Sequence, residues 1–284
     1  MKMRESDCTV VKFPLLRRLV VDVADIGRKR NTIRGLIEVD ITNARSLLRQ
    51  YRDRAGEKLS FTAFVIRCVA RALDDDRSIQ AFLDWRNRLV IFDDVDVQTM
   101  VEADIDGAKT VVPHIVRAAN RKSHLEIHED IRATQADPRR DRRLARLAGW
   151  FPYVPKQLRR MAYWWIKKRP RLLKKNIGTT IVTSVGMMFG SGGGWGIGTG
   201  SLHSFGVLLG SMVKKPGVVN GRIEVREYLY VGLSFNHDTV DGAPATRFAR
   251  RFVKMLESAD ELKADLAKLD MAKPSDKTGE ATPT

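Results

Sequence analysis

Residues 234–243 read Ser-Phe-Asn-His-Asp-Thr-Val-Asp-Gly-Ala, directly after the apolar, strand-like run Tyr228–Phe235. Imidazole is the side chain best suited to take a proton near neutral pH, so His237 is a candidate general base. Asp241, four residues later, is placed to orient that ring or the backbone that carries it, and Gly242 allows the tight turn that a switch from strand to helix needs. The following residues repeat apolar side chains at i, i+4, i+7 and i+8, which predicts a helix. A general base at a strand end is a common location for an active site.

The pattern His-x-x-x-Asp-Gly-Ala-x-x-x-x-Phe at 237–248 resembles the active-site signature of the catalytic domain of 2-oxo acid dehydrogenase acyltransferases. These are the dihydrolipoamide acyltransferases, relatives of chloramphenicol acetyltransferase. Four other segments are similar to motifs of that family and follow in its order: 35–42, 60–73, 106–123 and 178–187. The matches cover most of residues 17–135 and 176–260. One His-x-x-x-Asp-Gly motif is weak evidence, whereas five ordered matches at family-like spacing are strong evidence.

The resemblance implies an α/β fold, with a mixed β-sheet flanked by helices as in chloramphenicol acetyltransferase. We expect one acyltransferase-like catalytic domain at residues 1–270, with an insertion at 138–175 where the resemblance lapses. Residues 271–284 are polar and lack periodicity, which predicts a disordered tail. The periodicity predicts strands at 89–92, 95–101, 110–115, 178–184, 205–213 and 228–235, and helices at 43–51, 61–74, 122–135 and 244–269 besides those of the insertion.

The same resemblance implies a mechanism. His237 takes a proton from a thiol, the thiolate attacks an acyl thioester, and a hydroxyl stabilises the oxyanion that forms. The position of that hydroxyl falls on Thr183, with Ser184 as the alternative donor, and Asp241 fixes the active-site backbone and the histidine. The supporting residues are Asn236, where the family usually has an acid, Gly242, and Arg17 or Arg18 as the charge partner of Asp241.

Coenzyme A, as acyl-CoA, is the co-substrate that the resemblance implies, and the assembly is a homotrimer or a higher multiple of three with the active site between subunits. No lipoyl-type module is visible, so we expect a lipoyl group or another acyl carrier to act in trans. The acceptor stays open between a thiol, an amine and a hydroxyl. The alternative to a CoA-dependent acyltransferase is a catalytically silent or membrane-peripheral scaffold with the same fold. Chloramphenicol-type detoxification is disfavoured because the motif has no paired His-His.

Residues 186–200 are rich in glycine, but no register satisfies Gly-x-Gly-x-x-Gly and no Gly-Lys-Ser/Thr follows, which argues against a nucleotide loop. We expect a flexible or tightly turned loop beside the active site, where the resemblance places a substrate channel with Gly186 and Trp195. His124 and His128 stand at i, i+4 on a predicted helix, but no third zinc ligand follows at a suitable spacing. We therefore expect a solvated helix face there and no metal site.

The chain of 284 residues carries a net charge of +16, and most of this charge belongs to one segment. Residues 139–175 contain 14 Lys or Arg and a single acid, Asp141, which makes +13 and leaves about +3 for the rest. No apolar stretch is long enough for a membrane span, no signal peptide is apparent, and Cys8 and Cys68 suggest no disulfide framework. These features predict a cytoplasmic protein, soluble or membrane-peripheral.

The insertion at 138–175 has the pattern of a basic amphipathic helical hairpin. One apolar stripe runs from Leu144 to Phe151 and a second from Leu158 to Ile166, with Pro152 and Pro155 between them and Pro170 ending the second helix. The stripes are expected to pack on the domain or on a neighbouring subunit, with the arginines in solvent. Binding of an anionic membrane surface and docking of an acidic partner or substrate carrier are the alternatives. Nucleic acid is disfavoured because no zinc-finger spacing occurs and the aromatics follow helical stripes.

Overall fold

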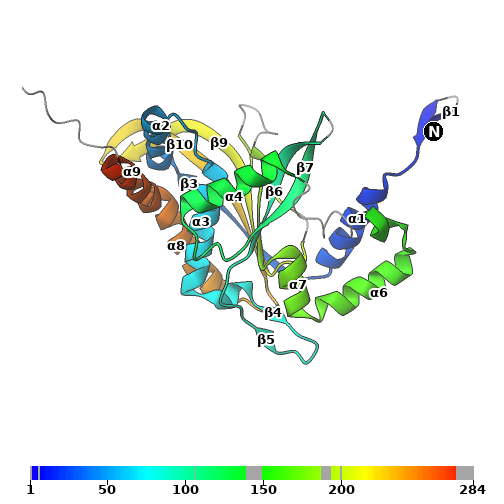
Figure 1. The fold of residues 1–284 in the computed structure, drawn as a ribbon. Coiled ribbons are helices and arrows are strands. Elements are labelled where there is room, and N and C mark those ends of the chain that lie inside the picture. Colours follow the sequence, from blue (N-terminus) through cyan, green and yellow to red (C-terminus); the bar gives the residue numbers. More distant parts are fainter. Residues whose placement is uncertain are drawn as a thin grey trace, which may run out of the picture.

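The computed structural model describes residues 2–5, 7–105, 107–138, 149–186, 193–198 and 200–272. Strands and helices alternate along the chain, which confirms the predicted α/β class (Figure 1). The strands are β1 (Lys2–Glu5), β2 (Cys8–Val11), β3 (Thr32–Asp40), β4 (Phe82–Leu83), β5 (Leu89–Val90), β6 (Val97–Ile105), β7 (Ala108–Val116), β8 (Thr180–Ser184), β9 (Phe205–Val219) and β10 (Arg222–Asn236). The α-helices are α1 (Leu15–Gly27), α2 (Thr42–Ala55), α3 (Phe61–Asp75), α4 (His124–Ala136), α6 (Lys156–Lys167), α7 (Pro170–Ile177), α8 (Gly242–Ser258) and α9 (Asp260–Ala272).

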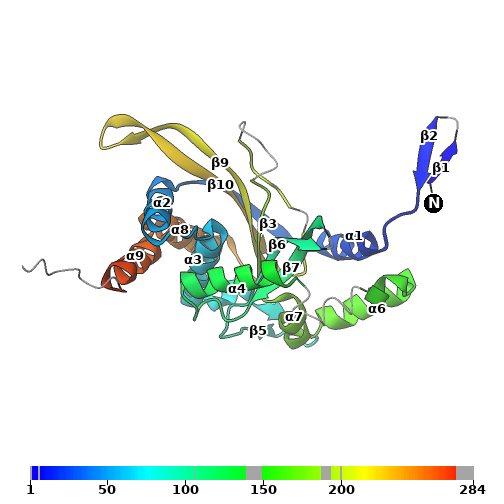
Figure 2. The same ribbon diagram turned by 45° about the horizontal axis from the view of Figure 1, so that its top comes forward.

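The central sheet has six strands in the order β3-β10-β9-β8-β6-β7. It is mixed, as predicted, because β8 runs parallel to both β6 and β9 while the other pairs are antiparallel. β9 and β10 continue beyond the sheet as a two-stranded arm (Figure 2). The sequence did not predict this arm, because its outer residues alternate Val and Ile with charged residues and none of them joins the core.

One face of the sheet packs against α2, α3, α4 and α8, with α9 over α2 and α4 (Figure 1). Alternate residues of β10 supply the core side of this layer, and Phe235 ends that row. Its ring lies next to Phe205, whose centroid is 4.6 Å from that of Phe248 on α8. Because these rings are buried, they fix α8 directly behind the end of β10.

The opposite face of the sheet is more exposed. Leu36, Met100 and Val111 point away from the helical layer, and 42–61% of their surface is accessible. A row of exposed aliphatic side chains on a sheet is the kind of surface that another chain covers.

Two predictions about helices differ from the structure, and one helix was not predicted. The helix expected at 244–269 is two helices, because Ala259 has a left-handed φ of 52° and breaks the chain between α8 and α9. Pro170 does not end a helix but begins α7, where its missing N–H costs nothing. α1 was not predicted. Most of the first insertion helix, at Leu144–Phe151, and the tail from 273 onward lie outside the described residues.

The second insertion helix, α6, is present as predicted, but its one buried residue is an arginine of the expected polar face. Leu158 and Met161 are more than half exposed, whereas Arg159 is buried and its Nε donates to the carboxylate of Asp22 on α1 at 2.6 Å. The prediction of solvated arginines is therefore wrong for Arg159, and the stripe does not pack on its own chain at Leu158 and Met161, whereas packing on a neighbouring subunit stays a prediction. α1 and α6 lie side by side because this ion pair joins them (Figure 1).

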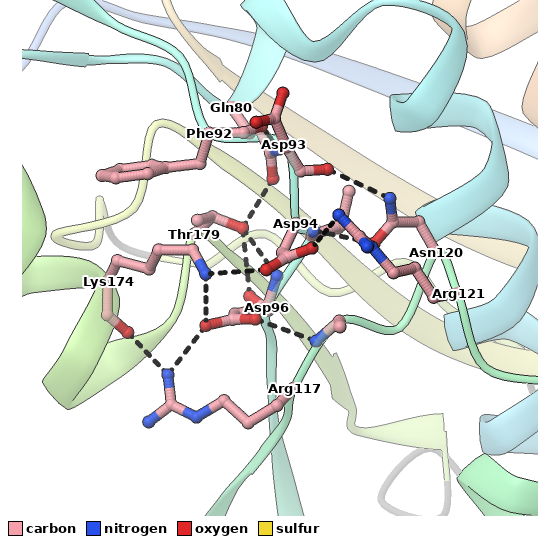
Figure 3. A network of polar contacts seen from close by, with 12 residues as sticks. Gln80, Phe92, Asp93, Asp94, Asp96, Arg117, Asn120, Arg121, Lys174 and Thr179 are labelled. Carbon is pink, nitrogen blue, oxygen red and sulfur yellow. Dashed lines mark hydrogen bonds and ion pairs between the residues drawn. The ribbon is translucent and has the colours of Figure 1, made fainter.

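The end of the insertion is attached to the sheet through Asp96. Its carboxylate is buried and lies 2.8 Å from Arg117 and 3.1 Å from Lys174 of α7, while its second oxygen accepts the backbone N–H of Ala118 (Figure 3). Arg117 also donates to the carbonyl of Lys174. This network fixes α7 beside the first residue of β6. No helix within the described ranges is long and apolar enough to cross a bilayer.

Candidate active site

His237 is the first residue beyond β10. The pairing of β10 with β3 ends at Asn236 and Thr32, and the backbone N–H of His237 donates to the carbonyl of Asn31 at 2.8 Å. On the other side, the N–H of Asn236 donates to the carbonyl of Ser204, just before β9. The histidine backbone is therefore held by both neighbouring strands.

The imidazole ring of His237 is oriented by the turn that follows it. Nδ1 lies 3.2 Å from the carbonyl oxygen of Val240 and 3.8 Å from the Asp241 carboxylate. A carbonyl only accepts, so we assign the ring proton to Nδ1, which leaves Nε2 unprotonated. Half of the side chain is exposed. Among the residues that the structure describes, Nε2 has no hydrogen-bond partner, so it can accept a proton from a bound group.

Asn236 and Asp238 shape this turn. The carbonyl of Asn236 accepts the N–H groups of Thr239 and Val240, and the Asp238 carboxylate accepts the side-chain amide of Asn31 at 2.8 Å. Asn236 also acts through its side chain, because its Oδ1 accepts the backbone N–H of Asp238 at 3.4 Å. Asn31 and Asp238 were not singled out from the sequence, although the β3–β10 register brings Asn31 beside the turn.

Asp241 is not paired with either of its predicted charge partners, Arg17 and Arg18. The Asp241 side chain is 88% exposed, and within the described part of the chain its one ion pair is the contact with His237. Arg18 donates instead to the carbonyl of Pro152, and Arg17 is exposed on α1. Gly242 begins α8 with open space where a Cβ would be, so the turn does not require glycine there, contrary to the prediction.

Thr183 lines a cavity to which His237 does not contribute. It pairs with Leu208 in β9 and lines a small cavity of about 110 Å³ on the exposed face of the sheet, together with Arg34, Ser201 and Ser234. Ser184 is exposed at the end of β8 and does not line this cavity. His237 does not line it either, so one chain does not bring the candidate base and the candidate hydroxyl together.

The described part of the glycine-rich loop lies on the same face. Trp195 stacks on Tyr230 with ring centroids 4.1 Å apart, and its indole N–H donates to the carbonyl of Ile37. A Cβ on Gly196 would come within 2.4 Å of Leu208, and one on Gly186 within 2.3 Å of the carbonyl of Gly210. These positions need glycine because the loop approaches the sheet closely, as a tightly turned loop would. The cavity wall includes 196–198, but neither Gly186 nor Trp195.

A buried histidine supports the active-site turn from behind. His203 Nε2 lies 2.8 Å from the carbonyl of Ile177, the last residue of α7, and its own carbonyl accepts from Arg30 at 2.8 Å. Burial lowers the pKa of His203 to about 4, so the ring is neutral at pH 7. Burial, followed by the charge of Arg30, also lowers the pKa of Lys167, which interacts with Asp238.

His124 and His128 are structural. Both are buried, contrary to the prediction of a solvated face: His124 Nδ1 lies 3.0 Å from Asp265 and His128 Nε2 lies 3.1 Å from Glu57. These contacts join α4 to α9 and to the segment before α3. Among the residues that the structure describes, no group of three or more His, Cys, Asp or Glu could hold a metal ion.

Comparison with known proteins gives a consistent picture. The family model for the 2-oxoacid dehydrogenases acyltransferase catalytic domain matches residues 29–146 and 178–264 and leaves 147–177 between its two parts. Curated relatives include a dihydrolipoyllysine-residue succinyltransferase component of the 2-oxoglutarate dehydrogenase complex from Bartonella vinsonii subsp. berkhoffii, 26% identical over 81% of this chain and 48% of its own length. The lipoamide acyltransferase component of the branched-chain alpha-keto acid dehydrogenase complex of Bacillus subtilis is 25% identical over 80% and 46%. The chain thus spans about half the length of these relatives.

Solved structures show the same fold. A probable dihydrolipoamide acetyltransferase from Listeria monocytogenes superposes with a TM-score of 0.61 at 18% identity, covering 96% of this chain and 99% of that one. The truncated catalytic core of the 2-oxoacid dehydrogenase multienzyme complex from Thermoplasma acidophilum gives 0.61 at 21% identity, covering 87% and 97%. The cubic core of the pyruvate dehydrogenase multienzyme complex gives 0.63 at 15% identity, covering 89% and 94%.

Proposed function

The chain belongs to the 2-oxoacid dehydrogenase acyltransferase family by its catalytic domain, and we propose that it is a coenzyme A-dependent acyltransferase with His237 as general base. The observation that carries the proposal is the ring orientation: Nδ1 lies 3.2 Å from the Val240 carbonyl, which assigns the proton of the neutral ring to Nδ1 and leaves Nε2 as the acceptor. A base for a thiol needs this tautomer.

The reaction transfers an acyl group between two thiols. Nε2 of His237 takes the proton of the acceptor thiol, and the thiolate attacks the carbonyl carbon of the acyl thioester. The carbonyl π electrons move to oxygen, and the Thr183 hydroxyl donates a hydrogen bond to that oxyanion. The intermediate then collapses, the bond to the leaving sulfur breaks, and the leaving thiolate recovers the proton from His237. Coenzyme A is one thiol; the other is the acceptor, which we propose is a lipoyl group or another acyl carrier acting in trans.

The site is completed between subunits. Within one chain Thr183 lines a cavity that His237 does not reach, and the sheet face that carries Thr183 exposes Leu36, Met100 and Val111. A second copy covering that face would bring its own His237 to the cavity of the first. We therefore propose a homotrimer or a higher multiple of three, in keeping with the fold that the chain shares with multienzyme cores.

Release of free coenzyme A tests the proposal. The parent is incubated with acetyl-, propionyl- and succinyl-CoA and with dihydrolipoamide as acceptor, and new thioester is detected by mass spectrometry. His237→Ala should lower kcat roughly 10²- to 10⁴-fold with an unchanged oligomer size. His237→Ala turnover equal to the parent's would refute His237 as the base, and no acyl transfer to any thiol, amine or hydroxyl acceptor would favour the silent scaffold.

A further inference from the structure

A groove of about 910 Å³ separates the insertion from the β4–β5 hairpin. Its walls are Asp84, Trp85, Arg88 and Val90 on the hairpin side, and Trp164, Trp165, Lys168, Arg169, Pro170, Arg171 and Leu172 on the insertion side. The insertion wall lies within 147–177, the segment that the family model leaves unmatched. Whatever the groove binds is thus specific to chains with this insertion.

Three tryptophans line this groove and remain open to solvent. The exposed fractions of Trp85, Trp164 and Trp165 are 62%, 64% and 45%. The Arg169 guanidinium lies 3.7 Å from the ring centroid of Trp165, and that of Arg86 lies 4.4 Å from that of Trp85. Indole rings left in water at a concave site provide stacking surface for a flat ligand.

The groove is also positive. Its one acid, Asp84, is neutralised by Arg88 at 2.8 Å and accepts the backbone N–H groups of Arg86 and Arg88. Lys168, Arg169 and Arg171 have no carboxylate within ion-pair distance anywhere in the described ranges. Three uncompensated cations beside stacking surfaces call for a ligand that is both aromatic and anionic.

We propose that this groove binds a nucleotide, with the base stacked on the indoles and the phosphates paired with Lys168, Arg169 and Arg171. Arginine binds phosphate through two parallel hydrogen bonds, and the volume lies in the range of small-molecule sites. An acidic peptide would use the cations but not three indoles. A bilayer would bind a convex apolar surface rather than a groove. The exposed apolar residues Leu158 and Met161 of α6 lie outside the groove.

Two kinds of ligand combine an aromatic base with phosphates in this way: a free nucleotide, and the adenosine 3′-phosphate 5′-diphosphate portion of coenzyme A. Arg171 and Leu172 of α7 line the groove, and the last carbonyl of α7 accepts from His203, next to Ser204, whose carbonyl accepts the N–H of Asn236. The helix that forms this wall is therefore connected to the turn that carries the candidate base. The coenzyme A source rests on the proposed function, whereas binding of a free nucleotide does not.

Calorimetric titration and quenching of tryptophan fluorescence test the site, with ADP, adenosine 3′,5′-bisphosphate and adenosine as probes. The measurements use the full chain carrying His237→Ala, so that a failed acyltransferase assay has no bearing on them. Both nucleotides should bind, and adenosine at least about tenfold more weakly because it has no phosphate. A clear preference for the 3′-phosphate assigns the coenzyme A source, and equal binding assigns a free nucleotide.

Matched variants localise the binding. Trp164→Ala should weaken it roughly 5- to 150-fold, the loss of one base–aromatic stack, and Trp164→Phe should restore most of it. Arg171→Gln should weaken it and reduce its salt dependence. The controls are Trp150→Ala and Lys175→Gln, two exposed insertion residues outside the groove, which should bind as the parent does. Circular dichroism confirms that each variant is folded.

Absence of binding by both nucleotides at millimolar concentration overturns the proposal. Equal losses in the control and groove variants would also overturn it, because the cations would then act only as a diffuse charge. Sedimentation with vesicles of 30% phosphatidylserine that Trp164→Ala abolishes, without nucleotide binding, would assign the groove to a membrane surface instead.

Discussion

Acidification should destabilise this protein through His203, and the effect should disappear when that side chain is replaced. His203 is buried, it donates from Nε2 to the Ile177 carbonyl, and its pKa is about 4 in the folded chain because burial disfavours the charged ring. In the unfolded chain a histidine has a pKa of about 6.5. Between these values the unfolded state binds more protons, so stability falls as the pH falls through this window.

The two pKa values set the size of the effect. Integrating the proton uptake from pH 7 to pH 4.5 gives a loss of roughly 2 kcal/mol attributable to this one ring. His203→Gln is the matched variant, because its amide can donate to the same carbonyl and does not titrate. Carboxylates that protonate near pH 4.5 contribute equally to both proteins and cancel in the comparison.

Urea unfolding followed by circular dichroism at pH 7, 6, 5 and 4.5 measures the difference. The parent should lose about 2 kcal/mol more than His203→Gln, with most of the divergence below pH 6. Parallel stability profiles for the two proteins would refute the reasoning, because the ring would then titrate alike in the folded and unfolded chains.

Three further changes test other contacts. Thr183→Val should raise the barrier to acyl transfer by about 2.7–4 kcal/mol while Thr183→Ser retains activity, and mixing inactive Thr183→Val with inactive His237→Ala should restore some turnover after subunit exchange; no recovery despite proven exchange would place both groups in one subunit. Arg159→Gln leaves the Asp22 carboxylate without its partner and should cost roughly 2–4 kcal/mol in thermal unfolding, whereas the exposed neighbour Arg160→Gln should cost almost nothing. Asp96→Asn keeps an acceptor for the Ala118 N–H but loses the charge facing Arg117 and Lys174, so we expect a loss of roughly 1.5–3 kcal/mol in chemical denaturation; a change below about 0.5 kcal/mol would show that the network adds nothing.

The sequence predicted the sheet and the position of the candidate base well, because both depend on local patterns. The apolar alternation of β10 and the motif that follows it place His237 at a strand end, where the structure has it. The break at Ala259 was not predictable from periodicity, because apolar residues continue at helical spacing across it.

The insertion was the least predictable part, because its helices are organised by charge rather than by burial. Arg159 faces inward only because Asp22 stands opposite on α1, 137 residues away in sequence. The buried histidines of α4 were unpredictable for the same reason, because His124 is paired with Asp265, which lies 141 residues away in the sequence. Helical spacing predicts which side chains share a face, but not which face a distant carboxylate makes the buried one.

The insertion is joined to the candidate active site by a short series of contacts. The last carbonyl of α7 accepts from His203, the carbonyl of His203 accepts from Arg30, and the carbonyl of the next residue, Ser204, accepts the N–H of Asn236. Asn236 begins the turn that holds His237. A ligand that shifts α7 would therefore move a backbone that supports the base, which gives the groove on the insertion a physical route to the chemistry. His203 lies at the centre of this route, so His203→Ala, which removes the hydrogen bond to Ile177 that His203→Gln keeps, is the variant in which occupancy of the groove should have the smallest influence on turnover.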